Sequence, residues 1–324
     1  MTAVSGAEGL HPWDVEPFVE LTDLELDAIT TRHGLPPMTR RLASTGVIHT
    51  IYVLGEQYVL RVPKPIDEGI SDLRAEVVAA PVARAAGVRT PALVVFDESH
   101  AVIDLPFTVF ELVAGEPLGA RSFDARRDAA VYRDLGRQLA TLHAGVTSID
   151  DPRGWMDHDE RAVDAEPLVG DLVRAGRLSP DAGRWVLDAF ARVRPAVEQA
   201  QARRRFVHND VQPNNVMVTP DGEAVLIDWG DAAWSEPTRD LNDLVPRAVP
   251  LVLAGYREVM PMDDDDTVFD RVLHDHLMGA LYHLGRPPVP GAAEWGRATG
   301  ARLVELLAAA TDADSWVRHV LSAP

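Results

Sequence analysis

The chain has 324 residues, 46% of them hydrophobic, which is enough to bury a substantial core in two lobes or two domains. It has no cysteine, which excludes disulfides and thiolate metal sites and is compatible with a reducing cytoplasm. Its formal net charge of −19 argues against nucleic-acid binding, which depends on Lys and Arg neutralising phosphates. The same charge either keeps the protein soluble or draws a cationic small molecule into an acidic cleft.

The N-terminus and the hydropathy of the chain give no sign of export or membrane insertion. The first stretch, MTAVSGAEGLHPWD, lacks the basic segment and apolar core of a signal peptide. No apolar run approaches the length of a membrane span. We therefore expect a cytoplasmic protein with no membrane partner, and the oligomeric state stays open.

The N-terminal part predicts a helix followed by three strands. Thr22 or Asp23 is the expected cap of a helix over residues 21–33. Three strands follow over residues 39–62, and the turn Ser44-Thr45-Gly46 separates the first two. Backbone N–H groups in such a turn can bind phosphate oxygens, although one glycine in a hairpin is commonplace by itself.

A second helix and two more strands come next. Ser71 is expected to cap a helix over residues 71–86, and Pro81 should kink or split it. Apolar runs predict strands over residues 91–96 and 107–113. Helical spacing of apolar residues then predicts helices over residues 126–143, 166–175 and 179–202.

The stretch FVHNDVQPNNVMVTPDGEAVLIDWGD predicts a β-hairpin flanked by polar side chains. A Pro-Asp-Gly turn joins two apolar runs, residues 216–218 and 224–227. Asp210 and Asn215, with four residues between them, precede the first strand, and Asp228 follows the second. Antiparallel pairing brings the two ends of a hairpin together, so we expect these three side chains to converge.

Beyond the hairpin the sequence predicts helices and an acidic run. A helix over residues 241–256 should be broken at Pro246 and Pro250. The carboxylates of residues 263–266 form either a patch for a cationic substrate or the solvated start of a helix, which the helix macrodipole favours. Closing helices are expected over residues 267–284 and 291–310. Three polar residues on the first of these are candidates for facing a substrate cleft: Asp275, His276 and His283.

The polar residues around the hairpin fit the needs of phosphoryl transfer. The reaction needs a carboxylate that orients or deprotonates the attacking hydroxyl, and hard oxygen ligands for Mg²⁺. Asp210 fits the first role, and Asn215 with Asp228 fits the second. A single Asp or Asn beside a turn is more often a turn former or a helix cap. The ordered set, with a hairpin of suitable length between its members, favours kinase chemistry.

HNDVQPNN followed by IDWGD resembles the HGDxHxxN and IDxxD motifs of the aminoglycoside phosphotransferase family, the small-molecule branch of the protein-kinase-like fold. The resemblance extends from about residue 39 onward and is specific only in this block. It implies a bilobal α+β fold. A small antiparallel sheet with one helix would form a nucleotide-binding N-lobe over residues 1–113. A larger, mostly helical C-lobe over residues 114–324 would carry the catalytic and acceptor-binding groups.

The resemblance also implies cofactors and roles for the hairpin residues. Mg²⁺ and ATP or GTP would be the cofactors. Asp210 would be the catalytic base, and Asn215 and Asp228 would bind the metal. Catalysis would come chiefly from positioning and charge neutralisation.

Further site residues follow from the same resemblance. Arg61 stands where the third strand of the N-lobe carries the basic residue that reaches the α- and β-phosphates, with Lys64 as the alternative. Arg is planar and always charged, so it does not simply replace the more usual Lys. Glu76 matches the helix glutamate that pairs with this residue. Ser44 and Gly46 lie in the loop that covers the phosphates.

The strand that ends near Val113 resembles the kinase hinge. The resemblance implies that main-chain groups near Glu111 and Val113 bind adenine and that Phe110 lines the back of the pocket. Gly115-Glu116-Pro117 then marks the boundary between the lobes.

The catalytic loop also departs from the family pattern. Asn209 and Asn214 stand where Gly is usual, and Asn tolerates left-handed backbone better than other non-Gly residues. Gln212 stands where His is common and removes a titratable group. His208 is interpreted as structural, and Asp240 as the buried aspartate that steadies the catalytic loop through its backbone.

The sequence leaves the acceptor open. We expect phosphorylation of a hydroxyl on an aminoglycoside-type antibiotic or a related metabolite, which would make the protein an antibiotic-resistance enzyme. A macrolide, an amino-sugar, choline or homoserine are the alternatives within the family. An interpretation of a different class is a catalytically weak nucleotide-binding protein, in which Asn209 and Gln212 mark lost turnover.

Overall fold

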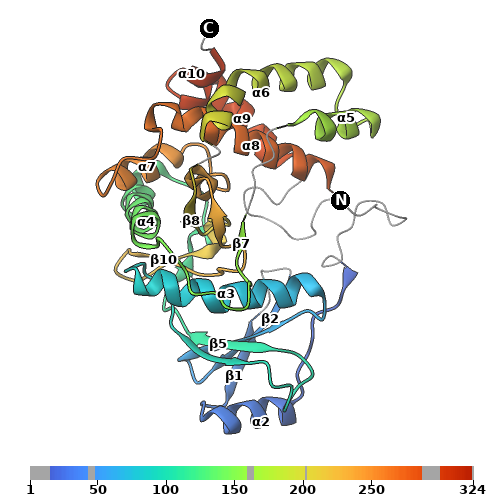
Figure 1. Cartoon of the computed structure of the whole chain (residues 1–324), viewed down its shortest axis with the longest axis vertical. Helices are drawn as coiled ribbons and strands as arrows, with labels where there is room; N and C mark the ends of the chain where they lie inside the picture. The colour runs from blue at the N-terminus through green and yellow to red at the C-terminus, as the bar shows by residue number, and fades with distance from the viewer. Residues whose placement is uncertain (1–14, 43–47, 159–163, 201–202, 287–299, 323–324) are drawn as a thin grey trace.

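The computed structural model describes residues 15–42, 48–158, 164–200, 203–286 and 300–322. They form two lobes, an N-terminal antiparallel sheet with helices and a mostly helical C-terminal part, as Figure 1 shows. This is the predicted bilobal α+β fold. The sheet consists of β1 (Met38–Leu42), β2 (His49–Leu54), β3 (Tyr58–Pro63), β4 (Leu93–Asp97) and β5 (Phe107–Glu111).

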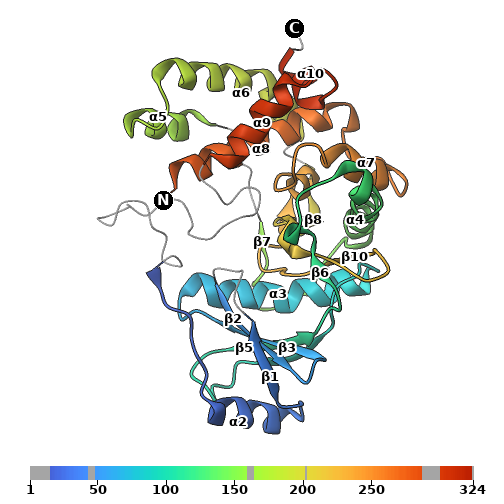
Figure 2. The ribbon, with the colours of Figure 1, turned by 180° about the vertical axis from the view of Figure 1, so that it is seen from behind.

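The N-terminal sheet has the strand order β1-β2-β3-β5-β4, and every neighbouring pair is antiparallel. Helix α2 (Asp23–His33) covers its far end, and α3 (Asp67–Ala85) lies between the sheet and the helical part (Figures 1 and 2). The Thr22 hydroxyl accepts a hydrogen bond from the Glu25 backbone N–H, and the Glu25 side chain accepts one from the Thr22 backbone N–H. This capping box confirms one of the two predicted caps.

Helix α3 begins earlier than predicted and is not split at its proline. It begins at Asp67 rather than at Ser71, so Ser71 is not its cap. Two acidic residues in the first turn, Asp67 and Glu68, favour the helix start through the macrodipole, although Ile66 supplies no capping side chain. Pro81 lies inside the helix, which is not split and continues to Ala85.

The C-terminal part combines helices with two small sheets. One sheet joins β6, β9 and β10, and the other joins β7, β8 and β11. The strands are β6 (Glu116–Pro117), β7 (Asp157–His158), β8 (Arg205–Val207), β9 (Val216–Val218), β10 (Ala224–Leu226) and β11 (Ala233–Ser235). The helices are α4 (Ala125–Gly145), α5 (Glu166–Arg174), α6 (Pro180–Ala200), α7 (Val249–Arg257), α8 (Val268–Gly285), α9 (Ala301–Thr311) and α10 (Trp316–Ser322). Short 3-10 turns are η1 (Leu118–Ala120), η2 (Pro213–Asn215), η3 (Pro237–Leu241) and η4 (Asp265–Thr267).

The helix predicted over residues 241–256 is replaced by η3 and the shorter α7. Pro250 lies in the first turn of α7. The N–H groups of a first turn have no acceptor within the helix, so a proline there costs no hydrogen bond. The break predicted at Pro250 is therefore wrong, because that proline starts a helix.

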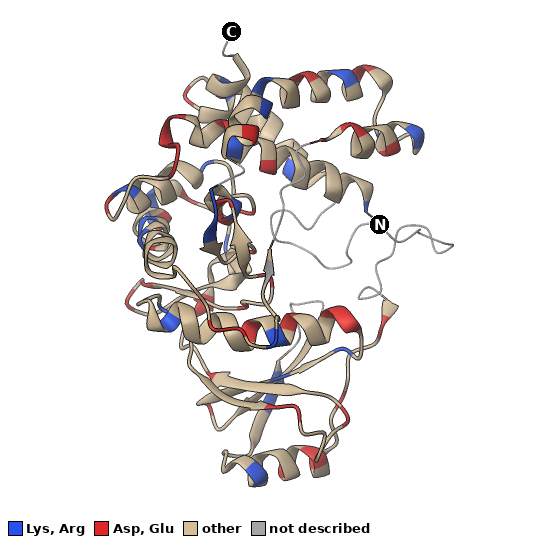
Figure 3. Ribbon diagram, in the orientation of Figure 1, with Lys and Arg blue, Asp and Glu red and all other residues tan. Residues whose placement is uncertain are grey.

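The acidic run is paired with arginines. The Arg205 guanidinium contacts both Asp263 carboxylate oxygens, at 2.8 and 3.0 Å. Arg203 lies 3.4 Å from Asp264, and Arg257 lies 3.1 Å from Asp265. Figure 3 shows acidic and basic residues spread over both lobes. Three of the four carboxylates in the run are thus paired with arginines of the C-terminal part.

Helices α4 and α7 cross at glycines. A Cβ added to Gly136 would lie 2.7 Å from the Tyr256 nitrogen, and one added to Gly255 would lie 2.6 Å from the Arg133 carbonyl carbon. Both obstacles are backbone, which cannot rotate away. The approach of the two helices therefore depends on these two glycines.

We expect Gly136→Ala to destabilise the protein by about 3 kcal/mol, because the added methyl group forces the helices apart. Ordinarily Gly→Ala inside a helix is stabilising by about 1 kcal/mol. Gly285→Ala is the matched control, because its Cβ would meet Leu172 at an ordinary 3.5 Å. Denaturant unfolding measures the free energy of unfolding of both variants. Equal stability of Gly136→Ala and Gly285→Ala would contradict the close crossing of α4 and α7.

Helix α8 buries a histidine that the fold holds neutral. His276 is 1% exposed and its Nε2 lies 3.0 Å from the Leu241 carbonyl oxygen. Burial lowers the pKa of His276 from 6.5 to about 4. Its neighbours Asp243 and Arg302 act on this pKa in opposite directions.

The unfolded chain therefore binds this proton first, so stability is lost as pH falls from 6.5 towards 4. Between pH 6.5 and 5 this histidine should cost the wild type about 2 kcal/mol. His276→Gln should show a shallower fall of Tm over that range, whereas His319→Gln, at an exposed position, should follow the wild type. Identical profiles for all three proteins would refute the assignment.

None of the described helices is long and apolar enough to cross a membrane.

Candidate active site

A left-handed residue sets up the catalytic loop directly after β8. Asn209 has φ 67°, a conformation that Asn tolerates better than other non-Gly residues, as predicted. Its backbone N–H donates to Asp240 Oδ1 at 2.6 Å, and the His208 N–H donates to Oδ2 at 3.2 Å. The Asp240 carboxylate also lies 2.9 Å from His143 Nε2. Asp240 thus holds the loop by its backbone, as expected.

His208 and Asn214 have structural surroundings. His208 is fully buried, its Nε2 donates to the Ile227 carbonyl at 3.0 Å, and its ring packs against Trp229. The predicted left-handed conformation of Asn214 is wrong, because it lies in the η2 turn with negative φ. It packs closely against Gly119 instead.

The Asp210 carboxylate is held by two amides. Asn215 Nδ2 donates to Asp210 Oδ2 at 2.6 Å and to the Asp210 carbonyl at 3.1 Å. Gln212 Nε2 donates to the same Oδ2 at 3.0 Å. Burial raises the pKa of Asp210 well above its usual range, and so do the nearby carboxylates of Asp231, Asp243 and Asp228. The hydrogen bond from Gln212 lowers this pKa, but its effect is smaller.

The hairpin brings Asn215 and Asp228 together as predicted. Strands β9 and β10 pair antiparallel, with Leu226 opposite Val216. The Ile227 N–H donates to the Asn215 carbonyl at 3.0 Å, which places Asp228 next to Asn215 at the open end of the hairpin. Asp228 also has positive φ, at 67°.

This pair fits a magnesium ion. Mg²⁺ is usually bound by one or two protein oxygens together with substrate phosphates and water. The Asp228 side chain remains 38% exposed, so the carboxylate is accessible to solvent. Burial opposes its charge, but Arg61 and His49 outweigh this and keep the pKa of Asp228 below its usual range. A deprotonated carboxylate beside the Asn215 amide is suitable chemistry for a hard cation.

Arg61 on β3 links the two lobes. Its guanidinium forms a buried ion pair with Glu76 of α3 and donates from Nη2 to Asp228 Oδ1 at 2.6 Å. The expected Arg61–Glu76 pair is therefore present. Lys64, the alternative cation, is buried and lies 4.2 Å from the centre of the Phe18 ring. Arg61 therefore brings a guanidinium directly to Asp228.

In the segment that resembles the kinase hinge, one of the main-chain groups expected to bind adenine already has a partner within the protein. The Glu111 N–H already donates to the Ala92 carbonyl at 3.0 Å, and the Glu111 side chain accepts from the Ala92 N–H at 3.1 Å. The Glu111 carboxylate is thus turned towards β4. Phe110 is buried among core residues, and Val113 is half-buried. Ser44 and Gly46 lie outside the described residues.

The sequence model described as the phosphotransferase enzyme family matches residues 39–287 of this chain. The chain belongs to that family. This membership confirms the predicted family.

Among curated proteins, the match covers a smaller part of this chain. Serine/threonine-protein kinase PknA of Mycobacterium tuberculosis is 34% identical over 110 residues, 31% of this chain. The match spans 25% of that kinase, so this chain covers about a quarter of the curated relatives it matches.

Two solved structures share the fold. One is a choline/ethanolamine kinase family protein from Mesorhizobium loti, with 18% identity, a TM-score of 0.60, and coverage of 93% of each chain. The other is the GDP and kanamycin complex of APH(2")-IIia, with 20% identity and a TM-score of 0.58. That alignment covers 79% of this chain and 90% of the other.

Two residues of the phosphotransferase site escaped the sequence analysis. Asp72 lies one turn before Glu76 on α3, and a Cβ on Gly230 would lie 2.6 Å from Asp72 Oδ2. His49 on β2 accepts from Arg61 Nη2 at 3.1 Å and lies 4.0 Å from Asp72. Asp72 had a signal, since its i, i+4 spacing to Glu76 places both on one helix face. His49 had none, because only strand pairing brings it to Arg61.

Two predicted cleft residues of this phosphotransferase are in the helical core instead. Asp275 is 2% exposed and His276 is 1% exposed. Asp275 lies 3.9 Å from Arg239, which orders it inside the C-terminal part. His283 is half-buried, and burial lowers its pKa to about 4. The helical period alone could not tell the cleft face of α8 from its core face.

Proposed function

We propose that the protein is a kinase that transfers the γ-phosphoryl group of ATP or GTP to a hydroxyl of a cationic small molecule. One observation carries the proposal. Asp210, Asn215, Asp228 and Arg61 converge from the catalytic loop, the hairpin and β3 in a chain of the phosphotransferase enzyme family. The proposal includes Mg²⁺ as cofactor and a cytoplasmic location, where nucleoside triphosphates are available.

Each residue has a defined task in this mechanism. Asp210 orients the acceptor hydroxyl and accepts its proton, which a carboxylate of raised pKa does more readily. The two amides on its Oδ2 fix its direction. Asn215 and Asp228 would hold Mg²⁺, which neutralises charge on the transferred phosphoryl group.

Arg61 would contact the α- and β-phosphates. It is held between Glu76 and Asp228, so its guanidinium is already oriented before a nucleotide arrives. The Glu111 carbonyl and the Val113 main chain are the proposed adenine contacts, and Phe110 the back of the pocket. The loop with Ser44 and Gly46 would cover the phosphates.

Charge supports a cationic acceptor. Asp231 and Asp243 are close enough to raise the pKa of Asp210. Asp243 forms an ion pair with Arg302, and Asp231 is exposed, so these residues bring carboxylates close to Asp210. Kanamycin, bound by one structural neighbour, and choline, which gives the other its family name, are both cations. An aminoglycoside-type antibiotic is the first acceptor to test, and an antibiotic-resistance role would follow from it.

The test is release of ADP or GDP with Mg-ATP and Mg-GTP across aminoglycosides, macrolides, amino-sugars, choline and homoserine. We expect turnover that depends on a cationic acceptor. Turnover on neutral acceptors alone would overturn the cationic assignment. Nucleotide binding without turnover on any acceptor would favour a catalytically weak nucleotide-binding protein. The structure supports the active enzyme, because Asn209 keeps the backbone hydrogen bond that fixes the catalytic loop.

A further inference from the structure

Residues 151–158, which we call the strap, run from the end of α4 across α3 to the second small sheet. Their last two residues form β7, which pairs in parallel with β11, with Asp157 opposite Ala233. Strand β11 begins two residues after Asp231, and thus shortly after Asp228. The strap therefore connects the metal-binding segment of the site with the outer side of α3.

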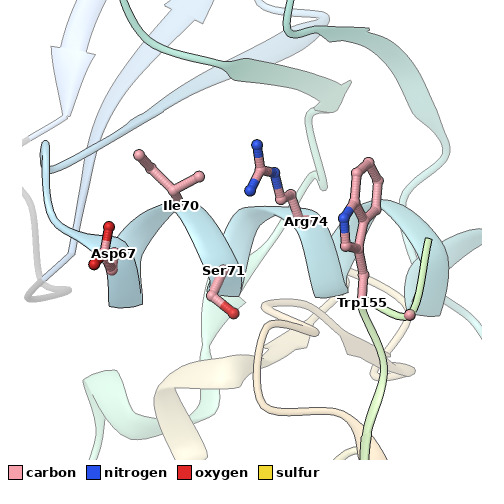
Figure 4. A pocket seen from close by; sticks show the side chains of 6 residues that line it. Asp67, Ile70, Ser71, Arg74 and Trp155 are labelled. Carbon is pink, nitrogen blue, oxygen red and sulfur yellow. The ribbon is translucent and has the colours of Figure 1, made fainter.

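Trp155 makes the contact with the N-terminal lobe. Its ring lies 5.6 Å from the Arg74 guanidinium carbon on α3 and packs edge-on against Phe96 of β4, with ring centres 5.8 Å apart. Arg153 stacks on the same ring at 4.7 Å and also forms an ion pair with Glu98. Figure 4 shows Arg74 and Trp155 side by side along α3.

A cavity lies between the strap and α3. Its volume is about 410 Å³, and it is lined by Asp67, Ile70, Ser71, Arg74, Gly154 and Trp155 (Figure 4). The Trp155 ring reaches across to Arg74 at one side of this cavity. Removing that ring would remove a contact between the strap and the helix.

The two halves of α3 pack against different parts of the protein. Ala79, Ala80 and Ala83 in the C-terminal half belong to the large hydrophobic core, whereas Leu73 in the N-terminal half belongs to neither core. Pro81 has no N–H to donate to the preceding turn, so the helix is weakened between its halves. The half that carries Asp72 and Glu76 is held instead by the buried Leu73 side chain and the Arg61–Glu76 ion pair, so a shift of this half acts directly on that pair.

We propose that Trp155 is a positioning residue for nucleotide binding, which acts through Arg74 and α3 on the Arg61–Glu76 ion pair. Its effect on the nucleotide rests on the proposed function, whereas its hold on α3 does not. By fixing the outer face of the helix, Trp155 keeps the Glu76 carboxylate against Arg61. The strap thus ties the geometry of the phosphate-binding cation to the segment that carries Asp228.

The hold on α3 is measured by hydrogen exchange without nucleotide. In Trp155→Ala, amides of residues 70–76 should exchange about tenfold faster than in the wild type, and Trp155→Phe should restore most of the protection. Trp185→Ala is the matched control, because Trp185 on α6 is 47% exposed and far along the chain. Unchanged exchange in α3 of folded Trp155→Ala would overturn the proposal.

The effect on the site is measured by Mg-ATP affinity in a double-mutant cycle with Glu76→Gln. Trp155→Ala should weaken binding about tenfold in the wild-type background and have little further effect beside Glu76→Gln. An equal loss in both backgrounds would show that Trp155 does not act through Glu76 and would overturn the inference. If the wild type binds no nucleotide, the proposed function fails, and hydrogen exchange still decides whether Trp155 holds α3.

Discussion

Replacing Asp210 by asparagine is expected to lower kcat by about a thousandfold while nucleotide affinity changes little. Asparagine keeps the shape of the side chain but cannot accept the hydroxyl proton. The proposed nucleotide contacts lie on other elements, chiefly Arg61 on β3. Steady-state kinetics with both substrates, together with calorimetric titration of Mg-ATP, separate the two effects.

Asp221→Asn is the matched control for this variant. Asp221 lies in the turn of the same hairpin and is exposed, so its loss should change neither kcat nor affinity. A folded Asp210→Asn protein with near wild-type kcat would mean that Asp210 is not the group that handles the acceptor hydroxyl.

The second large effect is expected from Asp228→Asn. Loss of this proposed metal ligand should lower kcat/KM by about a thousandfold and raise the Mg²⁺ concentration needed for half-maximal rate. The substitution also removes the charged partner of Arg61 Nη2, but Arg61 retains Glu76. The fold should therefore survive, and a thermal melt checks that it does.

Rates measured over a range of Mg²⁺ concentrations distinguish a metal ligand from a merely structural carboxylate. A ligand variant needs more Mg²⁺, whereas a structural variant loses stability and keeps the same metal dependence. An unchanged Mg²⁺ requirement in folded Asp228→Asn would remove this residue from the metal site.

The sequence was most informative where structure is local. The hairpin follows from two apolar runs and a Pro-Asp-Gly turn, and its open end necessarily brings Asn215 to Asp228. The left-handed conformation of Asn209 follows from its tolerance of positive φ. The pairing of Arg61 with Glu76 was expected from the family resemblance, which left Lys64 as the alternative cation.

Features that depend on tertiary packing escaped prediction. The acidic run meets Arg203, Arg205 and Arg257, none of which is adjacent to it in sequence. The start of α3 was missed because no capping side chain marks it. His49 was missed because only strand pairing brings it next to Arg61.

Transfer of a labelled γ-phosphoryl group from ATP or GTP to a cationic acceptor tests the central claim most directly. Wild-type protein with Mg²⁺ should yield a labelled acceptor, and Asp210→Asn should form it about a thousandfold more slowly. Equal transfer by the two proteins, or failure of the wild type to bind any Mg-nucleotide, would contradict the account.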